Sequence, residues 1–183
     1  MANIYGRKVS SAYIITFAEA NEIVDSSQGL ALGPCTCRTV FHRCNHPINT
    51  EIMLAPTGNV FIEDRPNDYR EISKEEARGI LAQCHRSGLV HTIVKCRENL
   101  YAICNCCACC CVPLRLSKKY GIGRALNRTD SIVREFREQV WQVDTESNVS
   151  PSGRFAQKVI LRSTATKNPL LDRADADSSQ SLS

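Results

Sequence analysis

Cysteine is the residue type through which this chain is best equipped to do chemistry. Eleven of its 183 residues are cysteines, well above ordinary usage. An odd number that includes three consecutive residues, Cys109 to Cys111, suits a set of disulfides badly. Nine of the eleven fall into two clusters, and their spacing is typical of thiolate ligands to soft metals. The sequence therefore predicts a metal-binding protein.

The first cluster has the spacing C-x-C-x6-C and consists of Cys35, Cys37 and Cys44. Two thiolates separated by one residue can face one metal centre from a turn, which the preceding Gly33-Pro34 favours. His42 and His46 flank Cys44, either as ligands of a mixed site or as surface residues and hydrogen-bond donors around it. We favour the second interpretation for both histidines.

The second cluster places six cysteines within eight residues: Cys104, Cys106, Cys107, Cys109, Cys110 and Cys111. Cys104, Cys107 and Cys110 form C-x2-C-x2-C, a spacing that lets three thiolates bind three corners of a cubane cluster. Cys106 and Cys109 form a second, interleaved C-x2-C. A structural zinc ion takes only four ligands, so a run this dense favours iron–sulfur over zinc.

Adjacent cysteines point in different directions, so the simplest partition of the ligands has two centres. Cys104, Cys107 and Cys110 would bind one centre, and Cys35, Cys37 and Cys44 the other. Each centre would take its fourth ligand from Cys106, Cys109 or Cys111. The expected cofactor is one or two iron–sulfur clusters of the [4Fe-4S] type, with zinc as the alternative.

Other residues near the clusters are open to more than one interpretation. Cys84 fits a buried thiol on a helix, and Cys96 is interpreted as a bystander. Arg38, Arg43 and Arg115 lie next to cysteines. Each would either raise the reduction potential of a cluster or be an ordinary surface arginine.

Two segments with similar sequences precede the two cysteine clusters, and the elements that they form must position these clusters. Residues 19–24 (Glu-Ala-Asn-Glu-Ile-Val) lead to Gly29-Leu30-Ala31, and residues 76–81 (Glu-Ala-Arg-Gly-Ile-Leu) lead to Gly88-Leu89-Val90. Each indicates an amphipathic helix, a glycine stop and a short extended segment. The similarity reflects either a duplication or chance. We expect an α+β fold in which two helix–strand units join two cysteine loops, plus a C-terminal helix and a disordered tail.

This pattern divides the chain into three parts. Residues 1–127 form a cysteine-rich iron–sulfur domain, in which 51–70 would be a connector with turns at 56–59 and 65–68. Residues 128–162 form a helical extension, and residues 163–183, rich in Ser, Thr, Asp and Ala, a disordered tail. The face of the extension expected to pack on the core contains Ile132, Val133, Phe136, Val140 and Trp141.

Charge and composition argue against several classes of protein and of binding partner. The net charge is +4 and no Lys/Arg run exceeds two residues, so we do not expect nucleic acid as a partner. No apolar run approaches the length of a membrane span, and the N-terminal segment lacks signal-peptide features, so we expect a cytoplasmic protein without membrane insertion. Phosphate-binding, dinucleotide-binding and haem-attachment motifs are missing, and the sequence does not indicate an enzyme.

The run Cys-Asn-Cys-Cys-x-Cys-Cys-Cys at 104–111 follows Gly-Leu-Val-His at 88–91 and Pro-Cys-Thr-Cys-Arg at 34–38. Together they resemble a group of uncharacterised bacterial and archaeal ferredoxin-like iron–sulfur proteins over about residues 15–125. In such proteins a ferredoxin-type module often follows, but residues 143–160 contain no cysteine here. A fourth cysteine is also missing after His46-Pro47, where Glu51 lies instead.

The resemblance and the cysteines together lead us to expect electron transfer to or from a redox partner protein, or a role as a small accessory subunit of a larger redox enzyme complex. Two alternatives remain open. One is a zinc-stabilised module that binds nucleic acid or protein. The other is an iron–sulfur sensor or regulator that releases or passes on its cluster.

Overall fold

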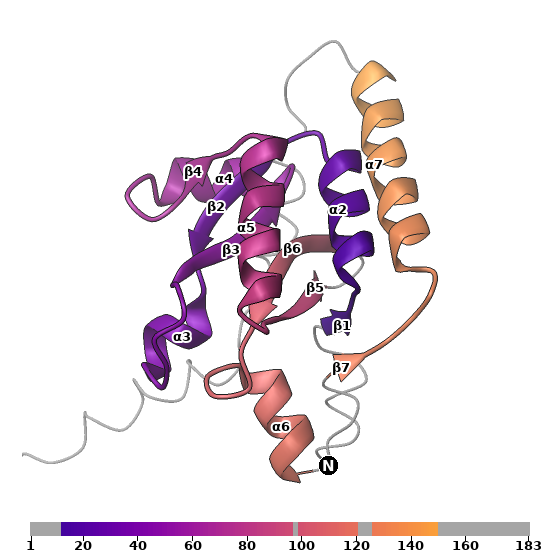
Figure 1. Ribbon diagram of the computed structural model, residues 1–183. Helices are drawn as coiled ribbons and strands as arrows, with labels where there is room; N and C mark the ends of the chain where they lie inside the picture. Colours follow the sequence, from indigo (N-terminus) through magenta and orange to yellow (C-terminus); the bar gives the residue numbers. More distant parts are fainter. Residues whose placement is uncertain (1–11, 97–98, 121–125, 150–183) are drawn as a thin grey trace, which may run out of the picture. The chain divides into compact units, whose positions relative to one another are not determined.

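The computed structural model describes residues 12–96, 99–120 and 126–149 (Figure 1). The chain divides into two compact units, Met1–Gln142 and Val143–Ser183. All eleven cysteines belong to the first unit. Of the second unit only the end of one helix is described, so the predicted disordered tail at 163–183 lies outside the described residues.

The described residues form a mixed α+β fold around a seven-stranded sheet, as predicted. The strands are β1 (Ala12–Ile14), β2 (Leu30–Pro34), β3 (Asn49–Leu54), β4 (Arg70–Glu71), β5 (Val90–Cys96), β6 (Asn99–Cys106) and β7 (Leu126–Asn127). Their order in the sheet is β4-β2-β3-β6-β5-β1-β7, and only the β1–β7 pair is parallel among the described strands. The helices are α2 (Phe17–Ser26), α3 (Thr36–Phe41), α4 (Thr57–Asp64), α5 (Lys74–Arg86), α6 (Val112–Tyr120) and α7 (Ile132–Val149).

The two similar units predicted from the sequence are each a strand, a helix and two strands. The first is β1-α2-β2-β3 and the second is β4-α5-β5-β6. β3 and β6 pair at the centre of the sheet, β2 and β5 flank them, and each unit's first strand pairs with the other unit's second strand. The topology therefore has an approximate twofold relation between the units.

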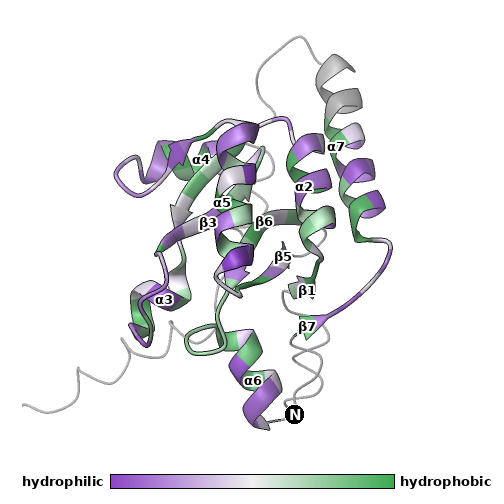
Figure 2. Cartoon of the chain, viewed as in Figure 1, coloured by the Kyte–Doolittle hydropathy of each residue, from purple (hydrophilic) through white to green (hydrophobic). Residues whose placement is uncertain are grey.

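The main core lies between the sheet and the helices α2 and α5, which lie side by side on one face (Figure 1). Both helices begin at a capping residue: Thr16 accepts a hydrogen bond from the Glu19 amide, and Ser73 accepts one from the Glu76 amide, each at 3.1 Å. The middle of β6 is hydrophobic in Figure 2, whereas the outer surface of α5 is mostly hydrophilic. This amphipathic pattern fixes which face of each helix meets the sheet.

The third predicted helix, α7, packs on this core only in part. Ile132 and Phe136 are fully buried and Val140 packs against them, because residues four apart share one helical face. Trp141 is 69% exposed, contrary to the expectation. It follows Val140 by one residue and is therefore rotated about 100° away from the buried stripe.

Residues 51–70 are more regular than the predicted connector. The turn at Arg65–Asp68 is present, with an Asp68 amide to Arg65 carbonyl hydrogen bond of 3.0 Å. The Pro56–Asn59 signal instead marks the start of α4, because proline is compatible with the first turn of a helix. α4 covers part of the second face of the sheet, where it packs against Ala31, Met53 and Tyr69.

The sheet topology explains why the two cysteine loops meet. β2 and β6 are both antiparallel to β3, so they run in the same direction with one strand between them. Their C-terminal ends therefore lie at the same end of the sheet, about 10 Å apart. β2 leads into α3 and Cys44, and β6 leads into the cysteine-rich turn before α6. In the described part of the chain, no helix combines the length and the apolar character needed to cross a membrane.

Candidate metal centre

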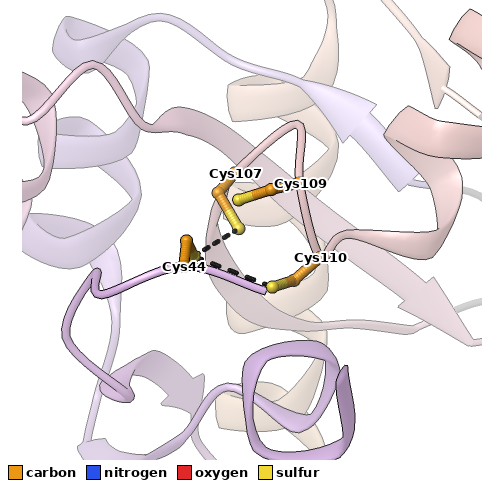
Figure 3. Close-up of side chains that lie close together, drawn as sticks. All are labelled: Cys44, Cys107, Cys109 and Cys110. Atoms are coloured by element: carbon orange, nitrogen blue, oxygen red, sulfur yellow. Dashed lines mark hydrogen bonds between the residues drawn. The ribbon is translucent and has the colours of Figure 1, made fainter. Parts of the chain in front are cut away.

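Four cysteine sulfurs at this end of the sheet form a tight cluster, which we call the compact group: Cys44, Cys107, Cys109 and Cys110 (Figure 3). Their Sγ atoms all lie within 4.8 Å of one another. The Cys44 sulfur is 3.7 Å from both the Cys107 and the Cys110 sulfur. Four thiolates this close can bind a metal, with one ligand from the first cysteine cluster and three from the second.

Local structure holds the compact group from two sides. Cys44 follows α3, which ends at His42 in the left-handed conformation with φ 46°. The other three ligands lie in the turn after β6, which closes with a Cys111 amide to Cys107 carbonyl hydrogen bond of 3.1 Å. Cys107 and Cys110 are buried, whereas Cys44 and Cys109 are half-exposed. A bound metal would therefore be enclosed on the core side and lie near the surface on the loop side.

Arg38 is the most unusual residue beside the compact group, because it is a cation with only 1% of its surface exposed. Its Nη1 donates to the Asn105 carbonyl at 2.8 Å, and Nη2 donates to the Thr50 hydroxyl. It also donates to the Cys107 sulfur, while its Nε has no hydrogen-bond partner in the described structure. A buried cation is costly without a negative partner, and metal-bound thiolates would supply that charge.

The electrostatics make Cys107 the most acidic of the cysteine thiols with a resolved shift. Burial opposes its ionisation, but hydrogen bonds from neighbouring thiols, the Cys110 amide and Arg38 outweigh burial and lower the pKa of Cys107 from 9.0 to about 6. Among these thiols, Cys107 therefore forms a thiolate most readily, and the thiolate is the form that binds metals.

A buried polar network supports the cysteine run from behind. The Asn105 side chain lies 2.7 Å from His91 Nδ1 and donates to the Thr50 carbonyl at 2.7 Å. His91 Nε2 is in turn 3.4 Å from His85 Nδ1. The sequence analysis named none of these three residues as a candidate. The available signal was Asn105 itself, a polar residue between two cysteines of a buried strand.

A second set of sulfurs lines a cavity of about 240 Å³ on the face of the sheet opposite α2 and α5. Residues of β1, β3, β5 and β6 form its floor, and the chain around α3 and the start of α6 forms its walls. The cysteines lining it are Cys35, Cys37, Cys104, Cys106, Cys107 and Cys111. We call four of them, Cys37, Cys104, Cys106 and Cys111, the cavity row, because all four line the cavity and each influences the ionisation of the next.

Polar partners and burial keep the cavity row protonated. The Cys104 thiol donates to Glu51 Oε1 at 3.2 Å, and the Cys106 sulfur lies 3.3 Å from the Thr92 hydroxyl. Although a hydrogen bond from Cys106 opposes it, burial and Glu51 raise the pKa of Cys104 to about 11. The hydrogen bond to Cys106, reinforced by burial, raises the pKa of Cys111 to about 12.

The sulfurs therefore group in space differently from the predicted partition. Cys44 lies with Cys107 and Cys110, whereas Cys104 lies with Cys37 in the cavity row. The reason is the alternation of side chains along β6: Cys104 and Cys106 point to the second face of the sheet, and the turn then brings Cys107, which also lines the cavity, to Cys44. Cys35, buried at the start of α3, lines the cavity beside the row.

The residues left outside the predicted clusters lie as follows. Cys84 is buried on α5 against Leu89, in agreement with the buried-thiol interpretation, and burial raises its pKa to about 11. Cys96 is exposed at the far end of β5. Neither His42 nor His46 belongs to the compact group. The guanidinium groups of Arg43 and Arg115 lie 5.2 and 5.5 Å from the centre of the Phe41 ring.

Comparison with known proteins gives no relative. No protein-family model, curated protein or solved structure matches the chain.

Proposed function

We propose that this chain is an iron–sulfur protein that transfers single electrons, with a cluster bound by the compact group. The observation that carries this proposal is that nine cysteines form two adjoining sets at one end of the sheet, with a buried arginine beside Cys107. Nine thiols exceed what one zinc ion can use, and soft thiolates are the preferred ligands of iron–sulfur clusters. The cysteine run that resembles ferredoxin-like iron–sulfur proteins supplies three of the four ligands.

The chain's own residues would tune such a cluster. Arg38 places a positive charge beside Cys107, which favours the reduced cluster and raises its potential. The half-exposed Cys44 and Cys109 leave the cluster close to the surface, where electrons can pass to another protein. A cluster held by Cys44, Cys107, Cys109 and Cys110 would supply one-electron redox chemistry, with no covalent bond made or broken. The partner is a redox protein or a larger redox enzyme complex.

Anaerobic purification with metal and acid-labile sulfide analysis tests this function. The proposal predicts iron and sulfide in comparable amounts and a brown visible band that dithionite bleaches. Zinc without sulfide, in a protein with no reducible chromophore, would contradict it.

A structural zinc site is the second candidate, and one observation favours it. Four sulfurs bound to zinc at about 2.3 Å lie at tetrahedron corners about 3.8 Å apart, close to the 3.7 Å from Cys44 to Cys107 and Cys110. The protein would then be a zinc-stabilised binding module, colourless as purified. A strong chelator would unfold it. The same metal analysis distinguishes the two candidates.

A further inference from the structure

We infer that the cavity on the second face of the sheet is a second metal site, in which Cys37, Cys104, Cys106 and Cys111 bind a second thiolate-ligated centre. This inference rests on the proposed function for the identity of the metal as iron with sulfide. It goes beyond that function because it assigns a separate set of ligands to a separate centre.

The first argument is the arrangement of the sulfurs. Cys37, Cys104, Cys106 and Cys111 all line the same cavity, and each affects the ionisation of the next: Cys37 with Cys111, Cys111 with Cys106, and Cys106 with Cys104. Cys106 and Cys111 are 7% and 3% exposed, so these thiols are withdrawn from solvent. Four linked thiols without a disulfide on one cavity wall match the ligand number of a thiolate metal centre.

The second argument is space. The cavity measures about 240 Å³, whereas one water molecule occupies roughly 30 Å³. Small residues make this room, because Ala12, Thr92 and Val94 line the floor where larger side chains would fill it. The cavity can therefore hold a guest of several atoms against the sulfurs.

The third argument is that the two sets of ligands adjoin at two points along the chain. Cys106 belongs to the cavity row, and Cys107, which also lines the cavity, belongs to the compact group; Cys111 and Cys110 divide between the two sets in the same way. Cα atoms of adjacent residues are about 3.8 Å apart. Two centres bound by such neighbours lie close enough for their unpaired electrons to interact.

Glu51 gives the cavity a feature that the compact group lacks. Its carboxylate is half-buried on β3 and accepts the Cys104 hydrogen bond at 3.2 Å. A carboxylate beside four thiols offers an oxygen ligand if one thiolate leaves the centre. The sequence analysis placed Glu51 where a fourth cysteine of the first cluster was missing, and in space it lies against the second cluster.

The test compares iron content after anaerobic reconstitution with ferrous iron and sulfide. The variants are Cys106→Ser with Cys111→Ser in one chain, and Cys96→Ser as the matched control, because Cys96 is exposed at the opposite end of the sheet. The double variant should bind about half the iron of the unmodified protein, and the control should bind the same amount. An unchanged iron content in the double variant would overturn the second site.

A single variant tests the inference even if the double variant does not fold. Cys37→Ser changes a half-buried position on α3 and leaves the sheet intact. Electron paramagnetic resonance of the dithionite-reduced unmodified protein should show two interacting spins, and Cys37→Ser should show one isolated spin. Identical spectra would overturn the inference. Unmodified protein that binds no iron and sulfide at all would instead contradict the proposed function.

Discussion

The compact group and the cavity row are made of cysteines that are neighbours in sequence, yet their environments differ. Cys107 receives hydrogen bonds from Arg38 and from the Cys110 amide, and its pKa falls to about 6 although burial opposes this. Cys106, one residue earlier, contacts other thiols and the Thr92 hydroxyl, and its pKa is raised, chiefly by its hydrogen bond with Cys104.

The comparison teaches that proximity of thiols does not decide how ready they are for a metal. In the compact group a buried cation and an amide stabilise the thiolate before any metal arrives. In the cavity row the thiols share protons with one another and with Glu51, so a metal must displace those protons. We therefore expect the compact group to take up metal before the cavity row.

Cys44→Ser should have the largest effect on this comparison. Cys44 is the only ligand of the compact group from the first cysteine cluster, and its loss leaves three thiols from one turn. We expect metal affinity at the compact group to fall more than about 100-fold, because even residues outside the ligand set alter affinity 10- to 100-fold. A competition titration with a chelator measures the affinity, and equal affinities in Cys44→Ser and Cys96→Ser would contradict the assignment.

In the metal-free protein, Arg38→Met should remove the stabilisation of the Cys107 thiolate that distinguishes the compact group from the cavity row. The variant leaves the Asn105 carbonyl and the Thr50 hydroxyl without their donor and the Cys107 thiolate without its cation. We expect the free energy of unfolding to drop by about 3 kcal/mol, measured by urea denaturation under reducing conditions. Arg43→Met, at an exposed arginine just after α3, should change this free energy by less than about 0.5 kcal/mol. Equal losses in both variants would show that the buried charge is unimportant.

The pH dependence of stability should have opposite signs in the two regions. The pKa of Cys107 lies below the ordinary 9.0, so its contribution to stability is present above about pH 9 and is lost as the pH falls through about 6. The pKa of Cys104 is about 11, so its contribution is present below about pH 9 and is lost as the pH rises toward 11.

The midpoints of urea denaturation of the metal-free protein, measured at a series of pH values, give both pH dependences. Cys107→Ser should flatten the acid side only, and Cys104→Ser should flatten the alkaline side only. If both variants flatten the same side, the two regions do not differ in the way described.

His46→Ala should have the smallest effect. The mixed Cys/His interpretation makes His46 a ligand, whereas the compact group consists of four cysteines without it. We expect metal affinity to change by less than about 2-fold, since the ligand set stays complete. A loss of metal affinity as large as that in Cys44→Ser would show that His46 is a ligand. The same chelator competition measures it.

The main elements of the fold were predictable because their signals are local. Ser73 with Glu76 marks the start of α5, and the glycine before Leu89 marks its end. The short strands β4 and β7 have two residues each, too few to show any periodicity. The pairing of each unit's first strand with the other unit depends on contacts distant in sequence, which no local pattern contains.

The cysteines of the candidate site could be predicted from the sequence, but the way in which they group in space could not. Ligand spacing indicated the clusters, but it contains no information that the end of β6 brings Cys107 to Cys44 while Cys104 lies against Glu51. The burial of Arg38 was equally inaccessible, because an arginine beside a loop looks the same in sequence whether or not a fold closes over it. Its role depends on the Thr50 and Asn105 groups that β3 and β6 bring to it.

X-ray absorption at the iron and zinc edges of the anaerobically purified protein tests the central claim most directly, because it reports the metal, its ligands and its neighbouring metals together. The account predicts iron surrounded by sulfur alone, with a second shell of iron atoms that only a cluster produces. Zinc bound by four sulfurs at about 2.3 Å, with no metal neighbour, would contradict it.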